Sequence, residues 1–214
     1  MTHSRPAPSH LRAVPESVTP ERKVDLQRAE HAVSELLEAL GYDSGSEAFA
    51  ATPGRVALSL AELTGGRPEP MSVFVNDDHM QGPVSVRDIA FVSLCEHHLL
   101  PFQGSVHISY IPGERIGGFS AFAQVVESFA HNLGLQETLT VRVADYLMQQ
   151  LEPLALSVTI EAQHMCMAAR GVRAREARIV TRELRGEAAQ DPAFLSFCAT
   201  TGMLGATDGG SSRG

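Results

Sequence analysis

Apolar positions near the start of the chain recur at helical spacing. A helix is expected from Val24 to Leu40, because apolar side chains recur within it at helical spacing, and Gly41 follows as a stop signal. A second helix is expected over residues 46–66, with a break at Thr52–Pro53 because proline lacks an amide hydrogen and restricts the residue before it. Pro53 then lies in the first turn of a helix that carries Arg55.

The rest of the chain alternates between strand and helix patterns. Period-two alternation and β-branched residues predict four strands, at residues 89–94, 105–112, 154–172 and 174–184. Helical spacing predicts three further helices, at residues 120–132, 136–151 and 191–198, the first with Ser120 as its N-cap. Helix pairs and strand pairs follow one another without βαβ units, which predicts an α+β fold.

Length and composition indicate one soluble domain. The chain has 214 residues, 43% of them hydrophobic, and domains typically run to about 100–200 residues. We expect this domain to span residues 23–200, between a disordered N-terminal segment (1–22) and a flexible tail (201–214).

Charge and hydropathy exclude two classes of partner. The formal net charge of −8 would repel a phosphate backbone, so nucleic acid is not expected to bind. No stretch reaches the roughly 18 apolar residues of a membrane span, and the first residues lack the apolar core of a signal peptide. A cytoplasmic location is therefore expected.

Two short motifs combine residues that ligate metals. Cys95 and His98 have the Cys-x-x-His spacing that aims two ligands at one point from a single turn, and "HMC" adds His164 and Cys166 further along. If both hairpins point at one site, Cys95, His98 and Cys166 hold zinc and leave its fourth position for water, as in catalytic centres. His97 and His164 then remain free for proton transfer.

The alternative is that these residues are packed in the core. Few cysteines are present, too few for a disulfide framework, and we expect Cys198 to be a buried core residue. For the two clusters the metal reading is favoured, because a charged Glu96 and an imidazole at His97 are costly to place in an apolar run without a purpose.

Several motifs between Val24 and Phe197 resemble the type I GTP cyclohydrolase family, zinc enzymes that convert GTP to dihydroneopterin triphosphate. The motifs are TPGRVA (52–57), CEHHLLPFQG (95–104), HISYIP (107–112), QETLT (136–140), IEAQHMCMAARGV (160–172) and FLSF (194–197). The resemblance implies a tunnelling fold (T-fold), whose antiparallel strands and helices associate into an oligomeric barrel. It also implies a homodecamer with active sites between subunits, and a role in pterin and tetrahydrofolate biosynthesis.

The resemblance assigns roles to individual residues. It makes Cys95, His98 and Cys166 ligands of Zn²⁺, which activates water for attack on C8 of the guanine. The implied catalytic residues are His97, which protonates the opening ring, His164, which assists loss of formate and opening of the ribose, and Ser120, which lies near the ribose. The implied substrate-binding residues are Glu137 and Gln136 at the guanine edge, and Arg55 and Arg170 at the phosphates.

Three positions depart from the family pattern. Leu58 and Ala121 stand where the family has lysine, and Gln124 stands where it has arginine. Alanine, glutamine and leucine offer no charge to a triphosphate. The substrate is therefore expected to be a guanine nucleotide with fewer phosphates, such as GMP, unless other arginines such as Arg115 or Arg173 replace the lost cations.

Two other functions remain open at this stage. The chain can be a catalytically inactive zinc-bound scaffold or regulatory homologue, although retention of His97, His164, Ser120 and Glu137 speaks against that. It can also be another tunnelling-fold enzyme, such as a nitrile reductase or a carboxydeazaguanine enzyme, in which the cysteine of CEHH would be a nucleophile. Zinc stoichiometry separates this last class from the cyclohydrolases.

Overall fold

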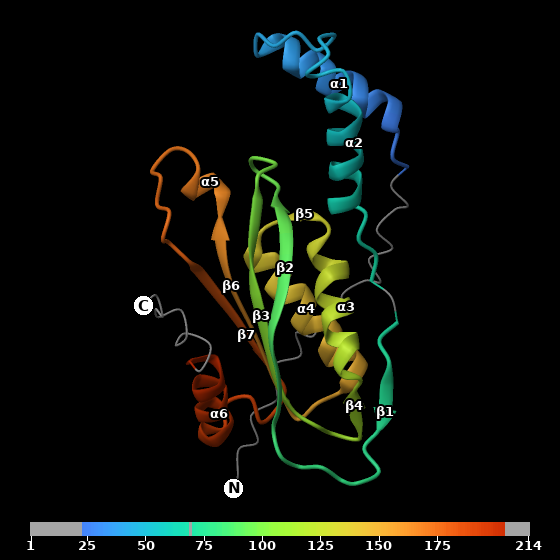
Figure 1. Ribbon diagram of the computed structural model, residues 1–214. Coiled ribbons are helices and arrows are strands. Elements are labelled where there is room, and N and C mark those ends of the chain that lie inside the picture. The colour runs from blue at the N-terminus through green and yellow to red at the C-terminus, as the bar shows by residue number, and fades with distance from the viewer. Residues whose placement is uncertain (1–22, 69, 204–214) are drawn as a thin grey trace, which may run out of the picture. The chain divides into compact units, whose positions relative to one another are not determined.

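The computed structural model describes residues 23–68 and 70–203, and the described chain forms two compact units divided between Ala57 and Leu58. The first unit contains α1 (Leu26–Ala39) and the start of α2 (Thr52–Leu63). The second contains the sheet and the remaining helices (Figure 1). The predicted terminal segments, 1–22 and most of 201–214, lie outside the described residues.

The first helix begins at Leu26, two residues later than expected, and ends just before the predicted stop at Gly41. The Asp25 side chain accepts a hydrogen bond from the main-chain N–H of Arg28 and caps α1. After the helix, Gly41 adopts a φ of +88°, which glycine tolerates better than other residues. The second helix is shorter than expected, because residues 46–51 form turns and α2 begins at Thr52. Proline at the next position cannot continue a helix from upstream, which explains the later start.

Five strands form the main sheet of the second unit. Their order is β5-β2-β3-β6-β7. The strands are β2 (Val84–Cys95), β3 (Pro101–Ile111), β5 (Leu133–Gly134), β6 (Ala155–His164) and β7 (Ile179–Arg185). Neighbouring strands are antiparallel except for β5, which is parallel to β2. The protein is thus α+β with a mixed, mainly antiparallel sheet, and the predicted fold class is confirmed.

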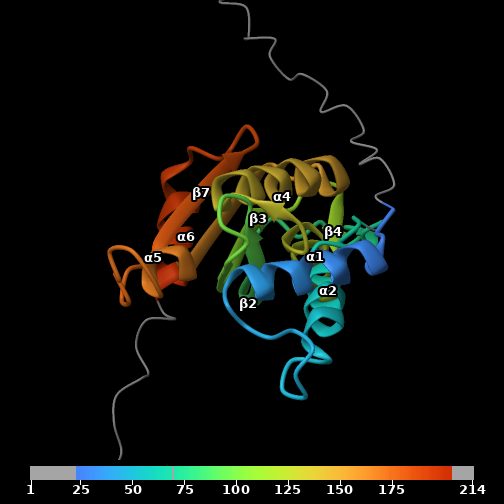
Figure 2. The same ribbon diagram turned by 90° about the horizontal axis from the view of Figure 1, so that it is seen from above.

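Alternation along the central strands decides which face is covered. On β3 the side chains of Val106, Ile108 and Tyr110 are buried, and the facing strand β6 adds buried apolar residues of the same face. Two helices, α3 (Phe119–Ala130) and α4 (Gln136–Leu151), pack against this face and complete the core. Figure 2 shows α4 running alongside the sheet.

The opposite face of the sheet is more polar. Ser109 and Ser157 lie on it, and α6 (Pro192–Met203) covers part of it with Phe194 and Cys198. Cys198 is 5% exposed, so its expected core position is confirmed. None of the described helices has the length and apolar character needed to span a bilayer.

Several local predictions are wrong at element ends. Gly118, not Ser120, is the N-cap of α3, and Ser120 is the second residue of the helix. The sixth strand ends at His164 and the chain turns into a short helix, α5 (Met165–Ala168), where an extended strand was expected through Val172. Two three-residue strands, β1 (Val73–Val75) and β4 (Arg115–Gly117), form a second sheet that was not predicted, since each is too short to show alternation.

Gly104 lets β3 and β6 approach closely. A Cβ at this position would overlap the carbonyl oxygen of Glu161 and lie 2.7 Å from Cα of Ala162. We expect Gly104→Ala to reduce the free energy of unfolding by about 3 kcal/mol, because the backbone must shift to admit the methyl group. Thermal unfolding measures this loss.

Gly134→Ala is the matched control for this substitution. Gly134 also lies in the sheet, but a Cβ there meets nothing within 4 Å. An equal loss of stability in both variants would contradict the close-approach argument.

Candidate metal centre

A tight turn between β2 and β3 carries the first two candidate ligands. The main-chain N–H of Cys95 donates to Leu100 O at 3.0 Å, and the N–H of Leu99 donates to Cys95 O at 2.9 Å. Leu99 has a φ of +54°, a left-handed conformation that closes the turn. These bonds keep Cys95 and His98 on one side of the turn, with Sγ of Cys95 at 3.8 Å from Nδ1 of His98.

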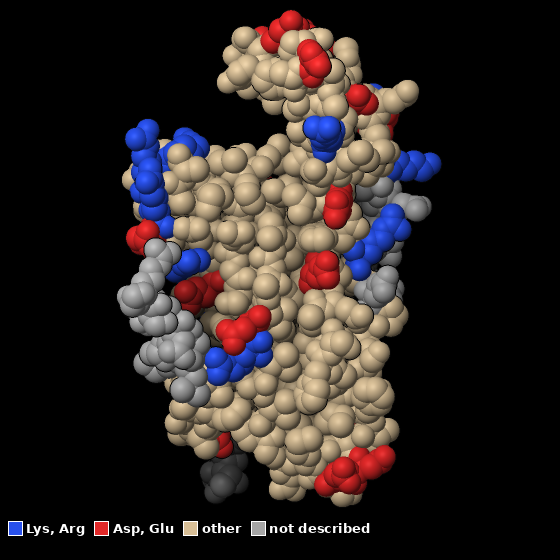
Figure 3. All heavy atoms as spheres, in the orientation of Figure 1, with Lys and Arg blue, Asp and Glu red and all other residues tan. Residues whose placement is uncertain are grey.

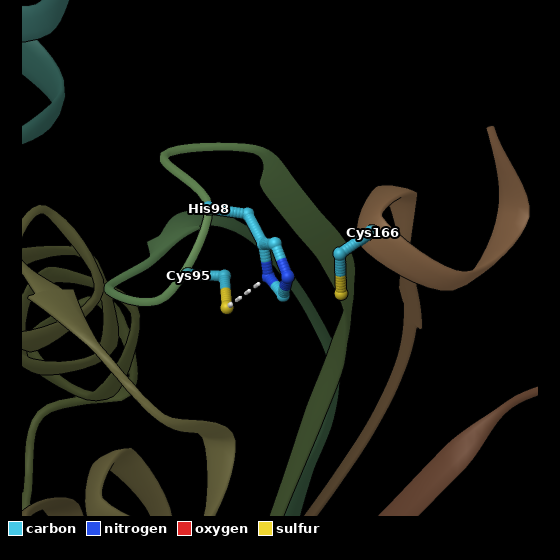
Figure 4. Close-up of side chains that lie close together, drawn as sticks. All are labelled: Cys95, His98 and Cys166. Atoms are coloured by element: carbon cyan, nitrogen blue, oxygen red, sulfur yellow. Dashed lines mark hydrogen bonds between the residues drawn. The ribbon is translucent and has the colours of Figure 1, made fainter. Parts of the chain in front are cut away.

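Strand pairing brings the third candidate ligand to the same place. The register of β3 with β6 sets Phe102 opposite His164, so the end of β6 lies beside the start of β3. Cys166 follows in the first turn of α5. One ligand atom each from Cys95, His98 and Cys166 lies within 4.8 Å of the others (Figure 4). The sequence prediction that these three side chains converge is therefore supported by the structure.

The two thiols are close enough to affect each other. Burial raises the pKa of the Cys166 thiol, and the nearby Cys95 raises it further by charge repulsion and hydrogen bonding. Cys95 itself is 5% exposed. A divalent cation between the sulfur atoms would favour both thiolates, because its charge outweighs the repulsion.

His164 is held beside this cluster by a ring and by an amide. Its imidazole stacks on the Phe102 ring at 4.6 Å with 10° between the planes. Its Nε2 lies 2.8 Å from Oε1 of Gln136. Burial lowers the pKa of His164, and the negative charge of Glu137 partly opposes that shift.

Similarity to known proteins decides the family of the chain. A family model described as GTP cyclohydrolase I matches residues 29–200. The chain belongs to the GTP cyclohydrolase I family. The GTP cyclohydrolase 1 of Bacillus cytotoxicus is 43% identical over 179 residues, which are 81% of this chain and 94% of that relative. The GTP cyclohydrolase 1 of Clostridioides difficile is 42% identical over 169 residues, which are 77% of this chain and 89% of that relative.

A further curated relative and one solved structure extend the comparison. The GTP cyclohydrolase 1 of Bacillus mycoides is 42% identical over 187 residues, covering 83% of this chain and 98% of its own length. The crystal structure of the archaeosine synthase QueF-Like in the apo form covers 49% of this chain and 93% of its own, with a TM-score of 0.41 and 17% identity.

Two residues expected at the guanine edge differ in exposure in this GTP cyclohydrolase I family member. Glu137 is exposed in the first turn of α4. Gln136 is 1% exposed, and its side-chain nitrogen donates into the sheet, to Ile160 O at 3.1 Å and Ile179 O at 3.0 Å. The Gln136 side chain is therefore buried and hydrogen-bonded within this chain, whereas the Glu137 side chain is exposed.

His97 and Ser120, both expected to be catalytic, lie in different parts of the second unit. The His97 side chain is 62% exposed on the turn that carries His98. Ser120 lies near the start of α3, whereas the far end of α3 leads to Leu133, which pairs with Leu94 next to Cys95. The helix has 12 residues and is thus about 18 Å long. A single chain consequently does not bring Ser120 to the metal ligands.

The candidate phosphate-binding arginines are exposed. Arg170 follows α5, in a loop that also carries Arg173, Arg175 and Arg178. Figure 3 shows Lys and Arg side chains gathered over this part of the second unit. Arg55 is exposed in the first unit. Arg170 therefore lies near Cys166 along the chain, since its loop follows the short helix α5 that contains Cys166.

The three departures from the family pattern differ in environment. Leu58 is 59% exposed, whereas Ala121 is 2% exposed and packed in the core. Gln124 is exposed and lines a cavity of 220 Å³ together with Ala121 and His131. Arg115, one of the arginines considered as a replacement cation, pairs with Glu152 at 3.0 Å.

Sequence reasoning missed the polar side chains that surround Gln136. Thr140 and Thr181 are joined to it by hydrogen bonds, although they come from α4 and β7. Thr140 stands four residues after Gln136, a spacing that places both on one helix face and was available as a signal. Thr181 offered no such signal, because only the packing of α4 on β7 brings it near.

Proposed function

We propose that the protein is a zinc-dependent GTP cyclohydrolase I-like hydrolase. It opens the imidazole ring of a guanine nucleotide at C8, releases formate and leads toward a dihydroneopterin product. The observation that carries the proposal is the convergence of Cys95, His98 and Cys166 beside His164. The curated relatives, named GTP cyclohydrolase 1, support the same activity.

The donor set fits zinc. Two thiolates and one imidazole are ligands that Zn²⁺ prefers, and a sulfur at about 2.3 Å and a nitrogen at about 2.0–2.1 Å from a tetrahedral zinc lie about 3.6 Å apart. The 3.8 Å between Sγ of Cys95 and Nδ1 of His98 is close to that separation. Three protein ligands leave one position open, where bound zinc would supply a Lewis acid that activates water near neutral pH.

The remaining residues of the site would move protons and hold the base. His97, exposed next to a ligand, protonates the ring nitrogen that is released as the ring opens. His164 assists the loss of formate and the opening of the ribose. Glu137 accepts hydrogen bonds from the N–H donors of the guanine edge, a pattern that adenine does not offer.

We further propose that the site is completed by a second copy of the chain. Ser120 is separated from the metal ligands by the length of α3, and a neighbouring subunit can supply it where one chain cannot. The family resemblance suggests a homodecamer. The cytoplasmic location expected from the sequence remains part of this proposal.

The phosphate end of the substrate is proposed to be shorter than in GTP. A triphosphate carries about four negative charges, and each charge-assisted contact contributes roughly 1.5–3 kcal/mol. Leu58, Ala121 and Gln124 provide none, and Arg115 is already paired with Glu152. The resemblance leaves Arg55 and Arg170 as candidate phosphate ligands, and Arg173 is exposed in the same loop as Arg170. This smaller set of cations suits a nucleotide such as GMP.

Formate release by zinc-loaded protein tests the function. GTP, GDP, GMP and guanosine are supplied in parallel, and pterin absorbance is recorded from the same samples. Turnover of GMP above GTP is the expected result. Preference for GTP would reject the shortened substrate but keep the cyclohydrolase, and a zinc-replete protein inactive on all four would favour the inactive scaffold.

Gln124→Arg is predicted to shift the preference toward GTP. One restored charge-assisted contact corresponds to roughly a 10- to 150-fold rise in kcat/KM for GTP relative to GMP. Position 124 is suitable because it is exposed, whereas a lysine at the buried Ala121 would disturb the core. Gln124→Met is the uncharged control of similar length, and an equal response of the two variants would argue against the idea.

A further inference from the structure

The neighbours of the Gln136 side chain determine which of its two amide atoms is nitrogen. The atom Nε2 lies 3.1 Å from Ile160 O and 3.0 Å from Ile179 O. Both are main-chain carbonyl oxygens, which only accept hydrogen bonds. An oxygen at the Nε2 position would face two acceptors without a proton between them, so the NH₂ group must point into the sheet.

The two threonine hydroxyls agree with this orientation. Thr140 Oγ1 donates its only proton to the main-chain oxygen of Gln136 at 2.8 Å. In the 2.6 Å contact between the two hydroxyls, Thr181 is therefore the donor and Thr140 the acceptor. Having used its proton, Thr181 Oγ1 accepts from Nε2 of Gln136 at 3.1 Å. The two amide protons are thus shared among three acceptors, Ile160 O, Ile179 O and Thr181 Oγ1, and each of these contacts requires nitrogen at the Nε2 position.

The orientation of the amide decides the protonation of the histidine ring. With the NH₂ group in the sheet, Oε1 of Gln136 faces Nε2 of His164 at 2.8 Å. An amide oxygen accepts only, so Nε2 must carry a hydrogen. In a neutral imidazole the other nitrogen, Nδ1, is then without one. Among the residues that the structure describes, Nδ1 of His164 has no hydrogen-bond partner.

Packing keeps the pair in place. Gln136 is 1% exposed, so water does not compete for its amide. The Phe102 ring lies against the imidazole with nearly parallel planes, which restricts ring flipping. The Gln136 side chain cannot also bind the guanine edge without giving up these contacts.

We propose that Gln136 is a positioning residue, which fixes His164 as the Nε2–H tautomer and makes Nδ1 the nitrogen that exchanges protons with the substrate. The inference rests on the proposed function, in which His164 moves protons. It replaces the role at the guanine edge that the family resemblance assigns to Gln136. Glu137, the exposed neighbour, is left as the residue that recognises the base.

Nitrogen spectroscopy tests the tautomer directly. Solid-state ¹⁵N spectra are recorded on zinc-loaded protein labelled only at histidine, at pH 8.5, and His164 is assigned by its loss in His164→Gln. We expect a proton on Nε2 and none on Nδ1. Thr181→Val should keep this spectrum, because Ile160 O and Ile179 O still accept both amide protons, whereas Gln136→Met should give a mixture of tautomers. A protonated Nδ1 in the wild type would overturn the inference.

Steady-state kinetics tests the positioning role. We expect Gln136→Met to lower kcat by about 10- to 100-fold, as for other residues that orient a functional histidine, with KM changed less than about threefold. A rise in KM that accounts for the whole loss in kcat/KM would mean that Gln136 binds the base and would reject the proposal. Absence of formate release in the wild type would defeat the proposed function instead, while the spectrum still reports the tautomer.

Discussion

Replacing Cys166 with serine should remove zinc and turnover together. Cys166 is one of the three candidate ligands that converge among the described residues, and a serine hydroxyl stays protonated where a thiolate would bind the metal. We expect the zinc content to fall from about one ion per chain to a small fraction of that. Formate release should fall by about 10³-fold or more, since activation of water by the metal is lost. Metal analysis and the formate assay on the same preparation measure both.

The third cysteine supplies the control. Cys198 is also buried, at 5% exposure, but it packs with Ala155 and Phe194 on the other face of the sheet. Cys198→Ala should keep its zinc and its turnover, although its folding is slightly weakened. Full zinc content in Cys166→Ser would show that the metal is held elsewhere, and the proposed centre would be wrong.

The sequence predicted contacts between residues that are close together along the chain more directly than contacts between residues that are far apart along it. Cys95 and His98 lie in one turn, so their spacing alone predicted that both point to one place. Placing Cys166 beside them also required a strand pairing, because the strand after Leu154 had to pair with the strand that follows His98. The α+β class followed from periodicity, but the order β5-β2-β3-β6-β7 did not, since alternation says which face is buried and not which strand is the neighbour.

The sequence also did not predict which polar side chains in the first turn of α4 point into the protein. Gln136 and Glu137 are adjacent, and both were expected to meet the substrate. A helix rotates by about 100° per residue, so neighbouring side chains point in different directions. Gln136 faces the sheet and is buried, while Glu137 faces outward. The inward direction is set by the packing of α4 against β6 and β7, which no local pattern specifies.

The position of Ser120 depends on how chains assemble, which the sequence of one chain does not specify. Its motif places it among the catalytic residues, yet in one chain α3 separates it from the metal ligands. If the site is shared, the residues divide into a metal half, with His97 and His164, and a second half with Ser120. This division is expected to appear in experiments that mix inactive variants, because each half then comes from a different chain.

Co-assembly of His97→Ala and Ser120→Ala subunits should restore activity that neither variant has alone. Each variant by itself is expected to lose about 100-fold or more, as for loss of a residue that transfers protons. In mixed oligomers, about a quarter of the sites combine an intact metal half with an intact Ser120 when the two subunits mix at random. The subunits are co-expressed with different tags, purified through both, and assayed for formate release.

The matched control mixes two variants of the same half. His97 and His164 both lie with the metal ligands in one chain, so His97→Ala with His164→Ala leaves every site defective. Recovery in the first mixture and none in the second is the pattern that a shared site requires. If the first mixture only averages the two parent activities, each site is built from one chain, and Ser120 must act at a distance from the metal or not in the reaction at all.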